Sequence, residues 1–509
     1  SERVSNMASH RVLAINRGEK EEFLKVKLEI DNDRMLKYIE NQYINKDNFK
    51  NKDILVAAIE DAYKRLIFPA IEREVRNHLT ELAQERAINV FGENIKNLLL
   101  QPPLKGKVVM GFDPGYVNGC KIAVVDASGK FLDEAIVYPH KPQSKTEQAK
   151  KILKKLIETY KIDVIAIGNG TASRESETLI SELIKELGVN TQYIIVNEAG
   201  ASIYSASELA AEEHPDINVS IRGAISIGRR LQDPLAELVK IDPESIGVGQ
   251  YQHDLNKKRL KEVLDGVVED SVNKVGLDLN TASHSLLEHI AGVSKTVAKN
   301  IIVYREENGP FKSRNELKKV KRLGPSAFVQ CAGFMRIENG KNPLDNTGVH
   351  PESYDICKKM LEILGYSLDD VKNKNISDID ERIENIGLKN LSEKLNVGEV
   401  TLKDIILEIK KPGRDPREED GMKPILRTDV LKIEDIKEGM TLKGTVRNVV
   451  DFGVFVDIGI KNDGLVHKSQ ISNKFVKDPM EICSVGDIID VKVIGIDLEK
   501  QRVSLSMKI

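Results

Sequence analysis

Three acidic residues stand at points in the chain where a phosphodiester-cleaving site would need them. Asp113 follows the short apolar run at 107–112, Glu198 follows a later strand-like run, and Asp233 lies in a predicted helix beyond it. Metal-assisted cleavage of a phosphodiester requires three or four converging carboxylates that hold two ions about 4 Å apart. These three residues are the catalytic candidates, and we assign no metal to them.

The strand-like run at 164–167 weakens the case for a nuclease, because a chain that resembles a resolvase would carry an acid at the end of this run. The residues that follow it are Gly168, Asn169 and Gly170, so no acid stands at its end. An amide is a poor ligand for a hard divalent cation. We therefore expect a chain that is not an enzyme and whose acids are vestigial, with a metal-dependent nuclease or resolvase as the alternative.

Aromatic residues near the C-terminus predict a surface on which bases stack. The period of two in a strand places Val454 and Val456 inside, so Phe455 points outward. Phe452 precedes a glycine and is expected to be exposed as well. Stacking is worth roughly 1–3 kcal/mol per base, which is a good reason for an exposed ring. The alternative is that both rings close the rim of a barrel.

Basic residues accompany these two rings. His467 and Lys468 follow a strand-like run beside the same face. Arg447 and Arg502 are candidates for phosphate contacts, and Lys492 is a weaker one. The set predicts a nucleic-acid-binding face.

Two glycine hairpins form a third candidate site. The first contains Gly292 and Lys295, and the second contains Gly324 and Ser326. Each glycine is expected to turn the chain with positive φ and to expose N–H groups at the start of the next helix, where a phosphate is favoured. The alternative is a scaffold without ligand. The basic residues nearby are Lys295, Lys299, Lys318, Lys319, Lys321 and Arg322.

A catalytic pair formed by His253 and Asp254 is a weaker hypothesis. Adjacent residues on a helix do not aim at one point. The basic run that follows, at 256–261, predicts a solvated or phosphate-facing side of a helix.

Five segments must position these residues, which predicts a multidomain protein of α, α/β and β parts. Residues 107–231 read as three strands in a meander followed by alternating helices and strands, the order of an RNase H-like α/β domain. The other segments are a helical core at 1–106, a duplicated helix-hairpin-helix unit at 232–345, a helical region with a linker at 346–428, and a small OB barrel at 429–509.

Composition bounds the function. With 509 residues the chain has room for several domains. A net charge of -3 excludes a histone-like polycation but permits a local nucleic-acid footprint. No apolar run reaches the length of a membrane span and no secretory leader opens the chain, so we expect a cytoplasmic protein that does not bind membranes. The four separated cysteines are expected to be buried, reduced thiols.

Three of these segments resemble known modules. The C-terminal segment resembles the S1 motif of RNA-binding domains, at 439–446, 452–457, 464–469, 485–487 and 503–506. The hairpins resemble a tandem helix-hairpin-helix domain, with Ser294 where that family often has a second glycine. Residues 107–231 resemble YqgF and, more distantly, RuvC-type resolvases. YqgF-type members place their second acid after the following strand, which fits Glu198.

The order of the segments is similar to that of the Tex family of bacterial transcription accessory proteins. The resemblance covers the whole chain and rests on strings at 10–19, 112–115, 197–202, 245–254, 342–345 and 349–354. Members usually carry a further N-terminal helical region, and because the chain begins at Ser1 we expect that region to be missing. The resemblance implies a YqgF-like domain without clear nuclease competence.

The residues and the resemblance together predict a nucleic-acid-binding transcription accessory protein without sequence specificity. We expect it to bind single-stranded RNA through the S1 domain, with DNA as an alternative ligand, and to hold phosphates at the hairpins. The expected partners are RNA and the transcription machinery, and no cofactor is expected.

Overall fold

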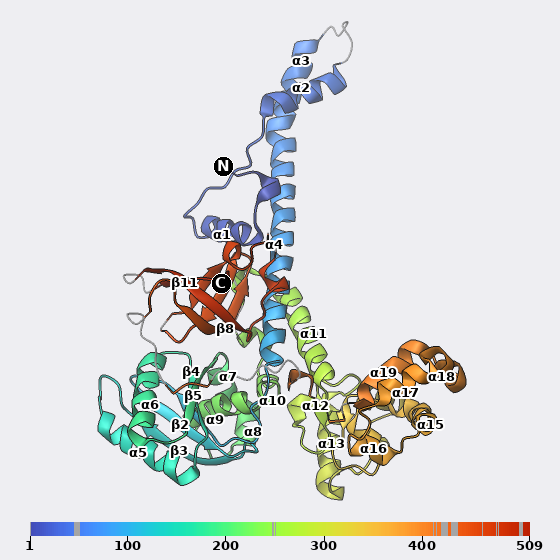
Figure 1. Ribbon diagram of the computed structural model, residues 1–509. Coiled ribbons are helices and arrows are strands. Elements are labelled where there is room, and N and C mark those ends of the chain that lie inside the picture. The colour runs from blue at the N-terminus through green and yellow to red at the C-terminus, as the bar shows by residue number, and fades with distance from the viewer. Residues whose placement is uncertain are drawn as a thin grey trace. The chain divides into compact units, whose positions relative to one another are not determined.

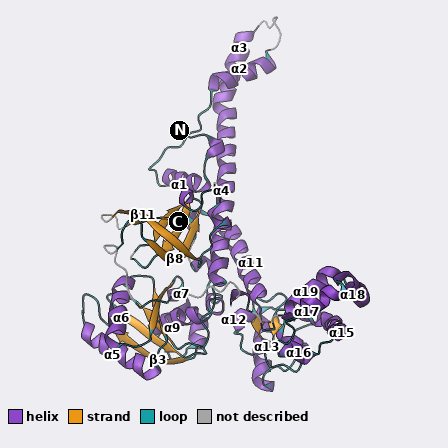
Figure 2. Cartoon of the chain, viewed as in Figure 1, coloured by secondary structure: helices purple, strands orange, loops and turns teal. Residues whose placement is uncertain are grey.

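The fold is described from a computed structural model. It describes residues 2–44, 51–246, 249, 251–410, 412–413, 415–418, 426–428, 436–460, 462–474, 476, 478–497 and 502–508. Residues 247, 248 and 250 of the string at 245–254 lie outside them, as do residues 411, 414 and 419–425 of the segment at 346–428 that contains the linker. The chain divides into two compact units, Ser1–Glu93 with Val248–Val263 and Asn94–Gly247 with Leu264–Ile509. Figures 1 and 2 show the elements of both units.

The first unit is helical, as the sequence predicts. A π-helical turn at Tyr63–Ile67 lies between α3 and α4, and the residues at both of its ends have right-handed helical backbone. Two helices, α4 and α11, begin in this unit and end in the second. The helices are α1 (Ser9–Lys20), α2 (Asn32–Tyr43), α3 (Lys52–Ala62), α4 (Phe68–Leu99) and α11 (Lys257–Val275).

Two distant strings of the sequence meet in this unit. The string at 10–19 is helix α1, and its Arg17 forms an ion pair of 2.6 Å with Asp254 of the string at 245–254. The Arg17 guanidinium also lies 4.7 Å from the centre of the Tyr251 ring. The turn of η4 (Gln252–Asp254) therefore has a structural role, and Asp254 is an ion-pair partner of Arg17 instead of a partner of His253.

The second unit begins with a five-stranded sheet of order β3-β2-β1-β4-β5. β1, β2 and β3 form an antiparallel meander, whereas β1, β4 and β5 are parallel. This is the RNase H-like topology that the order of elements predicts. The strands are β1 (Val109–Asp113), β2 (Cys120–Val125), β3 (Phe131–Val137), β4 (Val164–Gly168) and β5 (Gln192–Val196).

Helices cover both faces of this sheet. Leu153 of α5 and Ile180 of α6 pack on one face, while Ala224 and Ile225 of α9 pack on the other. Every residue of β4 is buried, as expected for a parallel strand between two layers. The helices of this domain are α5 (Thr146–Tyr160), α6 (Ser173–Leu187), α7 (Ala201–Ser205), α8 (Glu208–Glu213), α9 (Val219–Gln232) and α10 (Pro234–Leu238).

Glycine allows α9 to lie unusually close to the central strand. A Cβ atom added at Gly111 of β1 would come within 1.9 Å of the carbonyl oxygen of Ala224. Gly228 of α9 faces the same strand, with its own Cβ position 3.4 Å from the backbone nitrogen of Gly111. The approach of helix to strand thus depends on these two glycines.

Two helical regions follow the sheet domain. The duplicated hairpins are built from α12 (His284–Leu287), α13 (Lys295–Asn308), a 3-10 turn at Arg314–Lys319 and α14 (Pro325–Cys331), and the short parallel pair β6 (Leu277–Asp278) and β7 (Met335–Arg336) closes the region. The next core is formed by α15 (Tyr354–Leu364), α16 (Leu368–Lys372), α17 (Ile379–Ile386), α18 (Leu388–Leu395) and α19 (Glu399–Lys410).

The C-terminal segment is a closed barrel of order β10-β12-β11-β8-β9. Its interior is filled by valine and other aliphatic side chains from all five strands. Closure removes the free sheet edges that so small a domain would otherwise expose. The strands are β8 (Thr441–Val450), β9 (Gly453–Asp457), β10 (Gly464–His467), β11 (Ile488–Asp497) and β12 (Arg502–Ser506).

The structure bears on the expectations for the cysteines and for membrane-spanning helices. All four cysteines are free and buried, as predicted. No helix in the described ranges is both long enough and apolar enough to cross a membrane.

The contact between β1 and α9 generates a stability prediction. Replacing Gly111 by Ala places a methyl group against the backbone of Ala224, which neither element can avoid without moving. We expect Gly111→Ala to destabilise the domain by about 3 kcal/mol or more. Hydrogen exchange of the β1 and α9 amides in the full chain measures this loss.

Gly266→Ala is the matched control, because Gly266 lies inside α11 with no atom within 4 Å of its Cβ position. This change is expected to be neutral or to stabilise the helix by up to about 1 kcal/mol. Equal protection in the Gly111→Ala and parent proteins would contradict the packing argument.

Candidate nucleic-acid interface

The pleat of β9 places one aromatic ring on the barrel surface. Val454 and Val456 have no exposed surface, while Phe455 between them is partly exposed. In the strand register Phe455 lies opposite Asn448 of β8 and Leu465 of β10. The outward orientation that the sequence predicts for Phe455 agrees with its position.

Phe452 lies next to this ring at the start of the strand. The ring centres of Phe452 and Phe455 are 6.1 Å apart, with an angle of 86° between their planes. Such an edge-to-face contact is a preferred arrangement of two aromatic rings. Because Phe452 is also only partly buried, the two rings form one aromatic surface, with Phe452 in the turn before β9 and Phe455 on the strand. Neither ring is inside the barrel core.

The predicted basic residues lie at the end of the neighbouring strand. His467 is exposed and pairs in register with Gly453, and the backbone N–H of Lys468 donates to the carbonyl of Phe452. The His467 Nδ1 atom lies 2.9 Å from the Ser469 hydroxyl oxygen. The structure thus brings His467 and Lys468 beside the aromatic surface. Arg502 is exposed on β12.

Arg447 has a different role from the one the sequence suggests. Its guanidinium donates to Asp457 at 2.7 Å and to the carbonyl of Ile195 at 3.2 Å. Burial alone would raise the pKa of Asp457, but Arg447 and Arg427 hold that pKa below its usual value. Arg447 is therefore committed to a buried carboxylate, because an ionised Asp457 without a cation would be costly to bury.

The first hairpin has the geometry that its sequence predicts. Gly292 has φ of +79°, and its Cβ position lies 2.7 Å from the Gln330 side-chain oxygen, so a larger residue is excluded on two grounds. Ser294 caps α13 by accepting from the backbone N–H of Val297. Lys295 is the first residue of α13 and is exposed.

The second hairpin differs from its prediction. Gly324 has φ of -78° and is the N-cap of α14, whereas the left-handed residue of this turn is Arg322, with φ of +67°. Gly324 is therefore the counterpart of Ser294, and Arg322 is the counterpart of Gly292. No atom lies within 4 Å of the Gly324 Cβ position, and Ser326 beside it is exposed. This glycine leaves space in front of the helix.

Lysine and arginine side chains surround the second hairpin. The ammonium group of Lys318 lies 4.6 Å from the centre of the Phe328 ring, and Lys319, Lys321 and Arg322 are exposed around the turn. The surface of this hairpin is therefore basic, as the sequence predicts.

Asp113 and Glu198 meet at the carboxyl ends of the parallel strands. Burial raises the pKa of both carboxyl groups, and the charge of Asp113 raises the pKa of Glu198 further. Lys121 lies opposite Asp113 in the register of β1 and β2, and its charge lowers the pKa of each acid. The Glu198 Oε2 atom is buried without a hydrogen-bond partner.

The Glu198 carboxylate occupies the space at the end of β4. A Cβ atom at Gly168 would lie 2.1 Å from its Oε2 atom, and one at Gly170 would lie 1.7 Å from its Oε1 atom. Asn169, between these glycines, accepts from the backbone N–H of Glu198 at 3.1 Å. The Glu198 carboxylate, which follows β5, therefore fills the space that an acidic side chain at the end of β4 would need.

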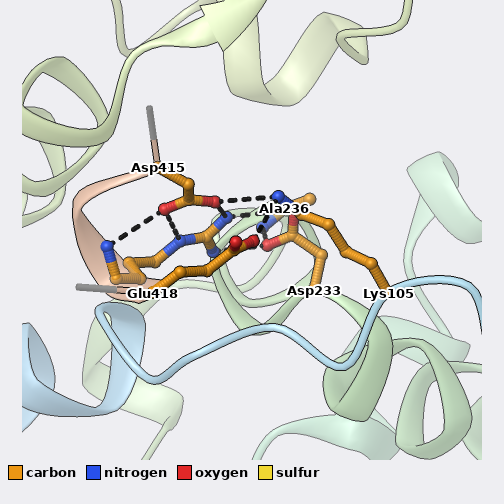
Figure 3. A network of polar contacts seen from close by, with 6 residues as sticks. Lys105, Asp233, Ala236, Asp415 and Glu418 are labelled. Atoms are coloured by element: carbon orange, nitrogen blue, oxygen red, sulfur yellow. Dashed lines mark hydrogen bonds and ion pairs between the residues drawn. The ribbon is translucent and has the colours of Figure 1, made fainter. Parts of the chain in front are cut away.

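Asp233 does not join this pair. It caps α10 by accepting from the N–H of Ala236 and forms an ion pair of 2.7 Å with Arg417 (Figure 3). Gly223, at the other end of α9, is the residue whose Cβ position lies 3.4 Å from Asp113 Oδ2. Ten residues of helix correspond to roughly 15 Å, so the expected third acid is too far away. Among the described residues no three His, Cys, Asp or Glu side chains could hold a metal ion.

Sequence reasoning missed the residues that engage Asp233. Arg417 is buried between Asp233 and Asp415, and Lys105 forms ion pairs with Asp415 and Glu418 (Figure 3). Despite the burial that opposes ionisation, Arg417 and Lys105 lower the pKa of Asp415 to about 2. Because the segment reads as a polar linker, only its folded environment reveals this network.

A second buried cation lies under the loop that carries Glu198. Arg230 of α9 donates from one nitrogen to the carbonyl oxygens of Asn197 and Ala199, both at 2.8 Å. Burial lowers the pKa of Arg230 to about 10, while Glu237 and Glu198 act in the opposite direction. Arg230 thus positions the β5–α7 loop.

Protein-family models match nearly the whole length of the chain. Two of them bear the name of one family, namely the Tex central region-like model at residues 1–91 and the Tex protein YqgF-like domain at residues 107–232. The others are a helix-hairpin-helix motif at residues 272–336, an HHH domain at residues 342–417 and an S1 RNA binding domain at residues 435–508. The match at 342–417 covers a region that the sequence analysis describes only as helices and a linker.

Curated relatives match along the chain. A protein of Bacillus subtilis, "Uncharacterized protein YdcI", is 54% identical over 506 residues, which are 99% of this chain and 70% of that protein. "Transcriptional accessory protein Tex" of Neisseria gonorrhoeae is 47% identical over 514 residues, which are 100% of this chain and 66% of that protein. The chain thus spans about two thirds of the length of these relatives.

Solved structures match more locally. The solution structure of GSP13 from Bacillus subtilis is 40% identical, covers 14% of this chain and 56% of that one, and has a TM-score of 0.14. The protein-family models and the curated relatives are sufficient to identify the family. The chain belongs to the Tex family.

Proposed function

We propose that this chain is a transcription accessory protein that binds single-stranded RNA without sequence specificity and without catalytic turnover. The observation that carries the proposal is the aromatic surface of Phe452 and Phe455 on the closed barrel, with His467 and Lys468 beside it. Bases of any identity have a face that stacks on such rings. The match to the S1 RNA binding domain supports RNA as the ligand, with DNA as the alternative.

The two hairpins supply the second contact in this proposal. Gly324 leaves open space before α14, and the exposed Lys295 begins α13 in the first hairpin. Phosphate contacts of this kind fix the position of a strand but carry no sequence information. Together with base stacking they favour binding that is weakened by salt and is nearly independent of sequence.

The acid pair favours a protein without turnover. Of the three candidate acids, only Asp113 and Glu198 lie together, while Asp233 forms an ion pair with Arg417. A two-metal site needs more ligands than two converging acids provide. The sheet domain is therefore proposed to act as a scaffold, and a nuclease is the alternative that experiment must exclude.

The link to transcription and the cytoplasmic location are also part of the proposal. They are supported by the name of the Neisseria gonorrhoeae relative, "Transcriptional accessory protein Tex", and by the match of the Tex models to this chain. The expected protein partner is the transcription machinery.

The aromatic surface gives the first prediction. Phe455→Ala removes one stacking ring and is expected to weaken binding of single-stranded RNA by roughly 5- to 150-fold, which corresponds to 1–3 kcal/mol for one base. The double variant with Phe452→Ala is expected to bind more weakly still. Fluorescence anisotropy of a labelled oligonucleotide, with the full chain at fixed salt, measures the affinity.

Ile494→Ala is the control on the same barrel, since Ile494 is 45% exposed on β11, which is not a neighbour of β9. Its RNA affinity is expected to match that of the parent. Unchanged affinity in the Phe452→Ala and Phe455→Ala double variant would contradict base stacking.

The second hairpin gives the next prediction. Gly324→Val adds a branched side chain in the open space before α14, at a φ that valine adopts readily. We expect the fold to persist and the affinity for RNA to fall about threefold or more, because a phosphate no longer reaches the helix. Gly398 before α19 has the same open surroundings, so Gly398→Val is the matched control. If both variants bind equally well, the hairpin does not contact the ligand.

The absence of turnover is tested with the full chain, Mg²⁺ or Mn²⁺, and labelled single-stranded RNA and branched DNA. We expect no cleavage above that of Asp113→Asn, and RNA affinity of that variant within about twofold of the parent, because stacking lies on a different domain. Cleavage that is abolished by Asp113→Asn and by Glu198→Gln would establish the nuclease instead.

A further inference from the structure

A basic surface lies on the first unit, whereas the barrel and the hairpins belong to the second. Four of the first five residues of α11 are basic, namely Lys257, Lys258, Arg259 and Lys261, and all four are exposed. Leu260 between them is buried and anchors the helix. We call Lys257, Lys258, Arg259 and Lys261 the α11 basic surface.

Helix stability does not explain these cations. The amino end of a helix carries partial positive charge, so acids stabilise it and lysines there are unfavourable. The first turn of α11 contains no acid. Asn256 already satisfies the helix start, since its side chain accepts from the N–H of Arg259 at 3.1 Å. A local choice that opposes stability indicates a function.

Two acids near this surface, Asp254 and Glu85, are paired with arginines, and Glu262 of α11 lies 3.9 Å from Arg259. Asp254 is paired with Arg17 at 2.6 Å and lies 3.7 Å from Lys20. Glu85 is paired with Arg259 at 2.7 Å. Within the part of the chain that the structure describes, no ion pair involves Lys257 or Lys258, so their charges are available to a ligand.

The composition of the surface favours nucleic acid over protein. Protein interfaces are enriched in aromatic residues and depleted in lysine. His253 and Asn256, which precede the helix, are exposed and polar, and the neighbouring Leu255 is buried. A lysine-rich surface without exposed apolar side chains matches what a phosphate backbone requires.

We propose that the α11 basic surface is a further contact for nucleic-acid phosphates, made chiefly by Lys257 and Lys258. This inference rests on the proposed function, because it extends the same ligand to a third surface of the chain. Arg259 contributes to the surface charge while it is paired with Glu85. The contact is electrostatic and does not select a sequence.

The test is RNA binding by the full chain that carries Lys257→Ala and Lys258→Ala. We expect a loss of affinity of roughly three- to tenfold at low salt and a salt slope reduced by about 1.4, since each lost contact with single-stranded nucleic acid removes about 0.7. The pair Lys257→Arg and Lys258→Arg is expected to restore both values, because phosphate accepts either cation. The thermal midpoint of the alanine variant is expected not to fall, since the cations oppose the helix dipole.

Lys151→Ala with Lys155→Ala is the matched control, because both lysines are exposed on α5 and the same charge is removed. An affinity and a salt slope equal to those of the parent in the α11 variant, with a loss in Phe455→Ala, would overturn this inference and leave the proposed function intact. An equal loss in the α5 control would also overturn it, because net charge would then explain the effect. Unchanged affinity in both the α11 variant and Phe455→Ala would overturn the proposed function itself.

Discussion

The pleat of β9 is the constraint on which the ligand-binding surface depends. Because successive side chains of a strand point to opposite faces, burial of Val454 and Val456 in the barrel fixes Phe455 on the outside. Closure of the barrel then determines which side is the interior, and Phe452 lies edge to face with Phe455. The aromatic surface is thus a consequence of filling the core.

The RNase H-like domain preserves the geometry of an acid pair without completing it. Glu198 reaches from the end of β5 into space left free by Gly168 and Gly170 at the end of β4. Where a further acid on α9 would face Asp113, the helix presents Gly223. The same helix depends on Gly228 for its close contact with β1.

Charged groups that resemble nucleic-acid contacts in the sequence divide into two classes in the structure. Arg447 is partly buried against the Asp457 carboxylate, and its contact with the carbonyl of Ile195 holds two segments of the second unit together. Lys258 and Lys295, in contrast, are exposed at the starts of helices. The distinction follows from solvation, since a buried guanidinium requires an anion, whereas an exposed ammonium keeps its water until a phosphate replaces it.

The sequence alone determined what short-range periodicity and turn chemistry encode. Patterns within about ten residues predict the order of strands and helices along the sheet domain, the inward valines of β9 and the positions of both hairpins. The left-handed residue is Gly292 in the first hairpin but Arg322 in the second. The sequence did not predict this difference, because a positive φ in a turn depends on the packing around it. The partners of Asp233, Arg447 and Arg17 were decided only by the tertiary structure, since an ion pair between groups on separate segments forms only when folding brings the two groups together.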